Sequence, residues 1–154
     1  MVLTTKQQTP TTDLPGIRPL TIIQNNRLDG RVVYRAFDRF TWQSRLVISF
    51  TTGKKSSRGH AALQQLTILA NKKLRYTVQV LMFHVPSWDN RIYLYEPGLY
   101  QQFRFPVYSG TGSKLSMVAS LKPIKGLTLE GKVSVIRENE KEKWEAGIQL
   151  RLNF

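Results

Sequence analysis

The chain has 154 residues and no cysteine, and its 23 Lys and Arg residues against 10 Asp and Glu give a formal net charge of +13. The length suits one domain or part of one. An apolar fraction of 41% is too high for a disordered chain, and the lack of cysteine excludes disulfides and thiolate metal sites. No apolar run reaches the roughly 18 residues of a membrane helix, and the positive charge suits contact with phosphates, nucleic acid or anionic lipid headgroups.

The first sixteen residues, MVLTTKQQTPTTDLPG, are rich in Thr and Pro. We predict a flexible leader over residues 1–17 and a folded region over 18–154. The leader lacks the run of about 7–15 apolar residues that follows the basic start of a secretory signal peptide. An exported protein would therefore have lost its signal, or this chain is the back part of a longer one.

From residue 27 onward, apolar and polar residues alternate in nearly every segment. A period of two places alternate side chains on opposite faces of an extended strand, and no window shows the spacing of an amphipathic helix. We therefore predict an all-β, antiparallel fold of about eight to ten strands. The alternating segments are 28–36, 42–50, 65–70, 74–82, 103–107, 115–121, 127–135 and 144–154, with 91–105 divided into two strands at Pro97-Gly98.

The connections between these segments are expected to alternate in length. Short turns are predicted at 38–40, 71–73, 96–98 and 122–126, and longer polar loops at 51–60, 84–90, 106–114 and 138–143. An antiparallel meander with tight turns at one end and long loops at the other is typical of outer-membrane barrels. This pattern predicts a transmembrane-type β-barrel, or the closing sector of a larger one.

The polar face of the predicted strands favours a barrel with lipid outside. It is rich in Thr, Ser, Gln and Gly rather than the mixture of Lys and Glu that is usual on soluble surfaces. Trp144 and Phe154 lie ten residues apart on one apolar face, which at about 3.3 Å per residue and a tilt near 40° spans roughly the 25 Å apolar band of such a barrel. Trp42 and Phe50 form a similar aromatic pair with a shorter spacing on one apolar face, although aromatic residues are also simply good strand formers.

The last twelve residues, KWEAGIQLRLNF, resemble the terminal strand of Gram-negative outer-membrane β-barrels. The resemblance implies an outer-membrane location and makes Phe154 a signal for the barrel-assembly machinery. The stretch RIYLYEPGLYQQFRFPVYSGTGSKLSMVASLKPIKGLTLEGKVSVIR is similar to the C-terminal barrel region of outer-membrane proteins that carry a helix-hairpin-helix segment far upstream, and this chain has no such segment.

Basic residues on the polar face are the candidate functional residues. In a barrel with lipid outside they line the lumen, where guanidinium groups bind carboxylates or phosphates and favour anionic solutes. A hydrated interior filled by salt bridges is the alternative, because narrow barrels leave little room for solute. The predicted lumen set is Arg31, Arg35, Arg45, Arg75, Arg104, Lys132 and Arg151, and the predicted insertion signal and aromatic girdle are Trp42, Trp144 and Phe154.

We predict no catalytic residue, metal site or cofactor. His60 and His84 have no carboxylate at a spacing that implies a metal site, and SGTGSK (109–114) lacks the order of a phosphate-binding loop. The expected partners are outer-membrane lipid, lipopolysaccharide, the barrel-assembly machinery and the remainder of a larger barrel. The alternative is a soluble basic β-barrel that binds nucleic acid through the aromatic and basic stretch 31–45, or a small apolar ligand.

Overall fold

The computed structural model describes residues 2–6, 24–52, 56–102 and 105–152, and within these ranges the chain is all-β. The one helical element among them is a 3₁₀ turn, η1 (Trp88–Asn90). The strands are β1 (Val2–Lys6), β2 (Gln24–Ala36), β3 (Phe40–Thr52), β4 (Ser57–Asn71), β5 (Leu74–Val85), β6 (Ile92–Tyr93), β7 (Val107–Tyr108), β8 (Gly110–Leu121), β9 (Leu127–Glu138) and β10 (Lys141–Leu152).

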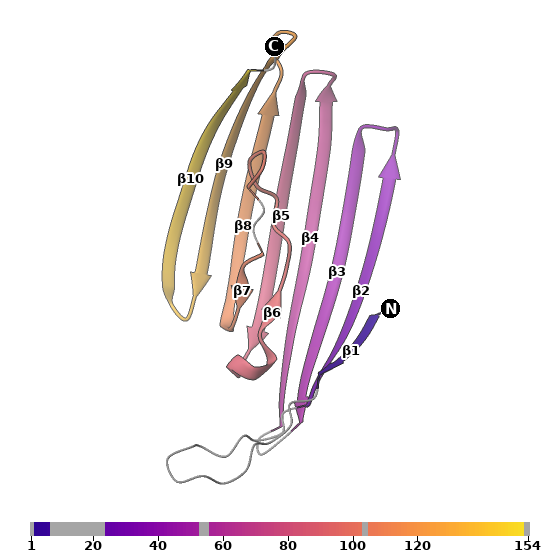
Figure 1. The fold of residues 1–154 in the computed structure, drawn as a ribbon. Coiled ribbons are helices and arrows are strands. Elements are labelled where there is room, and N and C mark those ends of the chain that lie inside the picture. The colour runs from indigo at the N-terminus through magenta and orange to yellow at the C-terminus, as the bar shows by residue number, and fades with distance from the viewer. Residues whose placement is uncertain (1, 7–23, 53–55, 103–104, 153–154) are drawn as a thin grey trace.

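Eight of these strands form one antiparallel sheet in the order β1-β2-β3-β4-β5-β8-β9-β10 (Figure 1). Every neighbour in the sheet is also the next long strand along the chain, so the topology is a meander, and the antiparallel all-β prediction is confirmed. The sheet is curved but not closed, because β1 and β10 form its two edges. In the structure these strands alone therefore do not close a barrel.

The two ends of the sheet differ in their connections. The tight-turn end carries the turns at 37–39, 72–73 and 122–126, and β10 runs toward that end (Figure 1). The predicted alternation of short and long connections is only partly correct. The polar run 138–143 is not a long loop, because β9 and β10 are joined by a two-residue turn in which Asn139 and Glu140 have φ of 46° and 67°. That positive φ is what a tight hairpin between twisted strands requires.

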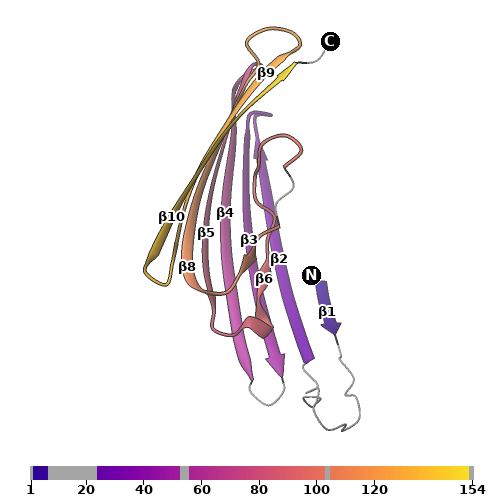
Figure 2. The ribbon, with the colours of Figure 1, turned by 60° about the vertical axis from the view of Figure 1, so that its left-hand side comes forward.

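The largest difference from the prediction lies between β5 and β8. Residues 86–109, which we call the crossing segment, do not add two long strands over 91–105. In their described part, 86–102 and 105–109, they contain only η1 and the two-residue strands β6 and β7, which pair with each other. Figure 2 shows this segment lying against one side of the sheet. Its three prolines, Pro86, Pro97 and Pro106, explain the break, because proline cannot donate a hydrogen bond to a sheet.

The crossing segment divides the sheet into a covered face and an open face. Directly paired residues on neighbouring strands point to the same face of the sheet. Asp29 pairs with Val47, Val47 with Ala61, Ala61 with Phe83 and Phe83 with Gly112, so all five lie on the covered face. The residues between them in sequence form the open face. The predicted division of side chains between two faces is therefore confirmed for the seven long strands β2, β3, β4, β5, β8, β9 and β10.

A small core lies between the sheet and the crossing segment. Its members come from the middle of the covered face and from the inner side of the segment, and they are Val47, Ala61, Leu63, Leu81, Phe83, Val85, Ile92, Leu94 and Tyr108. The covered face is thus not polar throughout. It has an apolar centre beneath the segment, and polar side chains surround that centre.

The structure describes residues 2–6 of the predicted leader. Val2–Lys6 form β1 and pair with Asn25–Asp29 of β2, so this part is a strand instead of a flexible segment. Residues 7–23 lie outside the described residues.

Candidate functional site on the covered face

A buried ionic cluster holds the middle of the crossing segment to the sheet. The Glu96 side chain is 1% exposed. Lys114 Nζ of β8 lies 2.6 Å from its Oε1 and 2.7 Å from its Oε2, and Lys132 Nζ of β9 lies 3.8 Å from Oε2. Tyr108 also donates its hydroxyl hydrogen bond to Glu96. One carboxylate is therefore shared by cations from two strands, and this arrangement compensates part of the cost of burying them.

Tyr108 responds to the same cluster. Burial raises the pKa of its phenol above the ordinary value, and the hydrogen bond to Glu96 and the negative charge of that carboxylate raise it further. The phenol is therefore neutral over the physiological range and acts as a hydrogen-bond donor. Its ring packs against Phe83 of β5, with ring centroids 4.9 Å apart, so Tyr108 joins the ionic cluster to the apolar core.

A second anchor holds the segment to β9 and β10. The Tyr100 N–H donates to Glu130 Oε2 over 2.8 Å, and the Arg151 guanidinium lies 3.9 Å from the centre of the Tyr100 ring. Leu99 lies over Gly147, where an added Cβ would be 3.2 Å from Leu99 Cδ1. The small residue at 147 therefore allows the segment to approach β10 closely.

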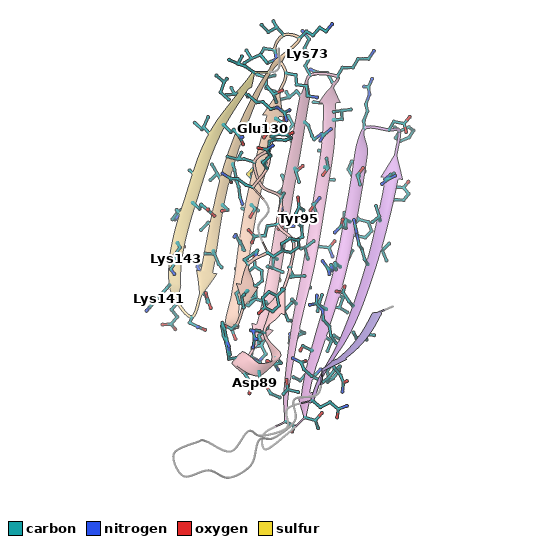
Figure 3. All side chains as sticks on the ribbon, viewed as in Figure 1. Lys73, Asp89, Tyr95, Glu130, Lys141 and Lys143 are labelled. Carbon is teal, nitrogen blue, oxygen red and sulfur yellow. The ribbon has the colours of Figure 1, made fainter. Side chains whose placement is uncertain are left out.

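The third anchor lies at the end opposite the tight turns. Asn25 of β2 donates to the backbone oxygen of Asp89 over 2.8 Å, and Arg27 donates to that of Tyr93 over 3.3 Å. Figure 3 shows how far the segment extends, since its Asp89 lies near one end of the sheet and its Tyr95 lies over the middle. Glu130 of β9, which accepts from the Tyr100 N–H, lies further toward the tight turns. With contacts to β2 at one end and β10 at the other, the segment crosses the covered face.

The side of the crossing segment that faces away from the sheet is aromatic. Tyr93, Tyr95 and Phe105 are exposed there, and the Tyr95 and Phe105 rings lie 5.7 Å apart. Inner and outer residues alternate along the segment, with Ile92 and Leu94 packed inward and Tyr93 and Tyr95 outward. The segment is therefore a second layer on the sheet with an accessible outer side.

The structure places every described member of the predicted lumen set on the covered face, but it does not bring them together. Arg45 binds Asp29 through two hydrogen bonds of 2.7 and 2.9 Å, and Arg31 donates to Gln43 over 2.7 Å. Arg35 and Arg75 lie near the tight-turn end and are exposed. Lys132 belongs to the buried ionic cluster and Arg151 to the second anchor, so both hold the crossing segment to the sheet. Arg104 lies outside the described residues.

The two predicted girdle residues that the structure describes lie on the open face. Trp42 of β3 is 37% exposed and Trp144 of β10 is 70% exposed, and Phe154 lies outside the described residues. Trp42 lies near the tight-turn end of its strand, whereas Trp144 lies near the other end of β10. The two indole rings therefore mark different ends of the open face.

Glu96, Tyr100, Tyr108 and Lys114 were missed by sequence reasoning. The signal that would have found Glu96 is its position directly before Pro97-Gly98, within a run of apolar and aromatic residues. A lone carboxylate in such a run must find a cation when it is buried. The identity of that cation is set by the fold, because Lys114 and Lys132 lie 18 and 36 residues away in sequence.

A basic hollow lies at the tight-turn end beside the second anchor. Lys73, Lys122, Lys125 and Arg151 line it, together with Thr128 and apolar residues. Lys73 Nζ donates to the backbone oxygen of Pro123, and the Lys73 backbone oxygen accepts from the N–H of Lys122 over 2.7 Å, so two turns are held together. These residues give the tight-turn end a positive potential.

No family model, curated protein or solved structure matches this chain. Among the described residues, no helix has the length and apolar character needed to cross a membrane.

Proposed function

We propose that this chain forms part of the wall of an outer-membrane β-barrel, with its open face in the bilayer and its covered face toward the lumen. The observation that supports this most strongly is the distribution of burial. Apolar side chains of the open face are exposed, whereas Lys114, Lys132, Ser116 and Ser134 of the covered face are buried. A soluble sheet buries its apolar face and leaves its polar face in water, which is the reverse arrangement.

The open face is apolar across all seven long strands. Monomeric soluble proteins rarely expose a contiguous apolar surface of more than a few hundred Å². Here the exposed residues follow one another from β2 to β10, and they include Val32, Leu46, Ile68, Met82, Met117, Val133 and Ile148. The strand lengths fit as well, since β2, β3, β4, β5, β8, β9 and β10 have 12 to 15 residues and a transmembrane strand needs about 9–11.

The role of the covered face follows from the crossing segment. Because the segment occupies the middle of this face, solute passes beside it, along the strands that carry Arg31, Arg35 and Arg75. A hollow lined by Arg31, Val33 and Arg35 lies on β2. We assign a passive role in which these guanidinium groups favour anionic solutes. Outer-membrane lipid and lipopolysaccharide are the partners on the bilayer side.

Insertion is assigned to the last strand. Its open-face residues Trp144, Ile148 and Leu150 are exposed, as lipid contact requires, and Phe154 continues the same alternation in the sequence. We predict that deletion of Phe154 impairs recognition by the barrel-assembly machinery while synthesis stays normal. Quantitative blotting of membrane and soluble fractions would measure this, and normal insertion of the deletion variant would contradict the assigned signal.

Membrane fractionation tests the proposal as a whole. The chain is expected in the outer-membrane fraction, to require detergent for extraction, and to migrate differently in gels with and without heating. A protein that purifies from cytosol without detergent would instead be the soluble alternative. If it then bound nucleic acid, its affinity would fall steeply with salt concentration.

The β2–β3 hairpin does not favour the soluble nucleic-acid platform. Tyr34 pairs with Trp42 on the open face, whereas Arg31 pairs with Arg45 on the covered face. Bases stacked on these aromatic rings would lie on the opposite side of the sheet from the arginines. A binding platform needs both kinds of side chain on one surface.

A further inference from the structure

The two edges of the sheet are built to be paired. β10 pairs with β9 along all of Lys141–Leu152, in unbroken register, and its other side is bare among the described residues. On β2, β1 covers only Asn25–Asp29, so none of the residues that the structure describes pairs with Gly30–Ala36 on that side. Natural edges are usually shortened, bulged or guarded by proline and inward charges. Neither of these stretches has a bulge or a proline. Both carry charges on the covered face, such as Arg31 and Arg151, and under the proposed function these charges face the lumen.

Strand direction restricts what can fill the gap between the edges. Seven long strands alternate in direction, so β2 and β10 run the same way, toward the tight-turn end. Direct pairing of these two strands would be parallel, whereas single-chain bacterial outer-membrane barrels are antiparallel with an even number of strands. β1 does not change this parity, because its five residues are about half of what a spanning strand needs.

The crossing segment sets a minimum size for the closed wall. With strands about 4.8 Å apart and tilted by about 40°, each strand adds about 1 Å to the radius of a barrel. Packed layers lie about 10 Å apart, so a wall that passes on the far side of the segment needs a radius of about 10 Å, or about ten strands. The outward aromatic side chains of Tyr93, Tyr95 and Phe105 need further room.

We propose that the sheet is completed by an odd number of further antiparallel strands, about three or more, that pair with β10 along Lys141–Leu152 and with β2 along Gly30–Ala36. This inference rests on the proposed function. A second copy of the sheet does not supply these strands. A two-fold axis along the barrel would place β10 beside the β2 of the other copy in parallel, and an axis in the membrane plane would insert one copy upside down.

Spin labels at Gly30 and Gly131 test the size of the wall. The chain has no cysteine, so Gly30→Cys and Gly131→Cys are labelled selectively, and an added Cβ meets nothing within 4 Å at either position. Both lie near the middle of their strands, β2 and β9, five inter-strand steps apart. The expected backbone separation is about 15 Å in an eight-stranded barrel and about 20 Å or more in a barrel of ten or more strands.

The labelled protein, extracted from its native membrane in detergent, is also weighed by native mass spectrometry. We expect a separation of about 20 Å or more, in a particle that carries further polypeptide and a single copy of this sheet. A separation near 15 Å, a particle with no polypeptide beyond residues 1–154, or a particle with two copies of this sheet would each overturn the inference. Recovery from the soluble fraction would instead refute the proposed function, so the two failures are distinguishable.

Discussion

Replacing Ile148 by arginine separates a membrane wall from a soluble sheet more sharply than any other single change. The Ile148 side chain is 83% exposed on the open face of β10. In a soluble protein, a substitution at such a position changes the free energy of unfolding by no more than about 0.5 kcal/mol. In a bilayer, the same substitution places a charge in hydrocarbon.

The depth of Ile148 determines the size of the effect. β10 has 12 residues, and at about 3.3 Å per residue and a tilt near 40° it spans roughly 28 Å of height. Ile148 lies about 18 Å from the Lys141 end, which is about 4 Å from the middle of that span. Arginine near the bilayer midplane costs about 2–4 kcal/mol, so we expect Ile148→Arg to lower the folded-to-unfolded ratio roughly 30- to 1,000-fold.

Leu152→Arg is the matched control. Leu152 lies on the same face of the same strand and is 56% exposed, but it is at the strand end, where a bilayer charge costs about 0–1 kcal/mol. Reversible unfolding by denaturant in phospholipid vesicles measures both variants. The reasoning is refuted if Ile148→Arg and Leu152→Arg unfold at the same denaturant concentration as the unmodified chain.

Three further predictions concern the crossing segment. Glu96→Gln removes the buried carboxylate that binds Lys114, so the segment should lose about 3–5 kcal/mol of its stability; hydrogen exchange is expected to rise within 86–109 while the long strands stay protected, and unchanged exchange there would contradict the assigned anchor. Because the pKa of Tyr108 is raised above its ordinary value of 10.0, its contribution to the stability of the segment is complete below about pH 10 and is lost as pH rises further; the protection of the segment, measured relative to the intrinsic base-catalysed exchange rate at each pH, should therefore fall above pH 10, and Tyr108→Phe should abolish that fall. Gly147→Leu should displace Leu99 and raise protease cleavage in the segment, whereas Gly131→Leu, with open space around the position, should not; equal cleavage of both variants would contradict the assigned contact between Leu99 and Gly147.

Local alternation was sufficient to predict the strands and their faces. Segments such as 127–135 and 144–152 place apolar residues at every second position, and the structure orients those side chains as expected. The same rule predicted the face of Arg31, Arg35, Arg45 and Arg75. A period of two depends only on backbone geometry, so it can be read without knowing the neighbouring strands.

The crossing segment could not be predicted in this way. Its residues also alternate, with Ile92 and Leu94 inward and Tyr93 and Tyr95 outward, so periodicity indicated a wall strand. The prolines at 86, 97 and 106 were the contrary signal, because they deny the backbone a long run of ladder hydrogen bonds. Alternation reports that a stretch has two different sides, but not which layer of the protein it belongs to.

The sequence by itself determined an antiparallel, all-β chain with an apolar face and a polar face, because pleating separates alternate residues whatever the strands pack against. Only the tertiary structure decided that the polar side is the covered one, that Glu96 lies against Lys114 and Lys132, and that the sheet stays open between β10 and the β1–β2 edge. Those features depend on pairing between distant residues and on the number of strands in the wall. Neither is encoded in the period of a single strand.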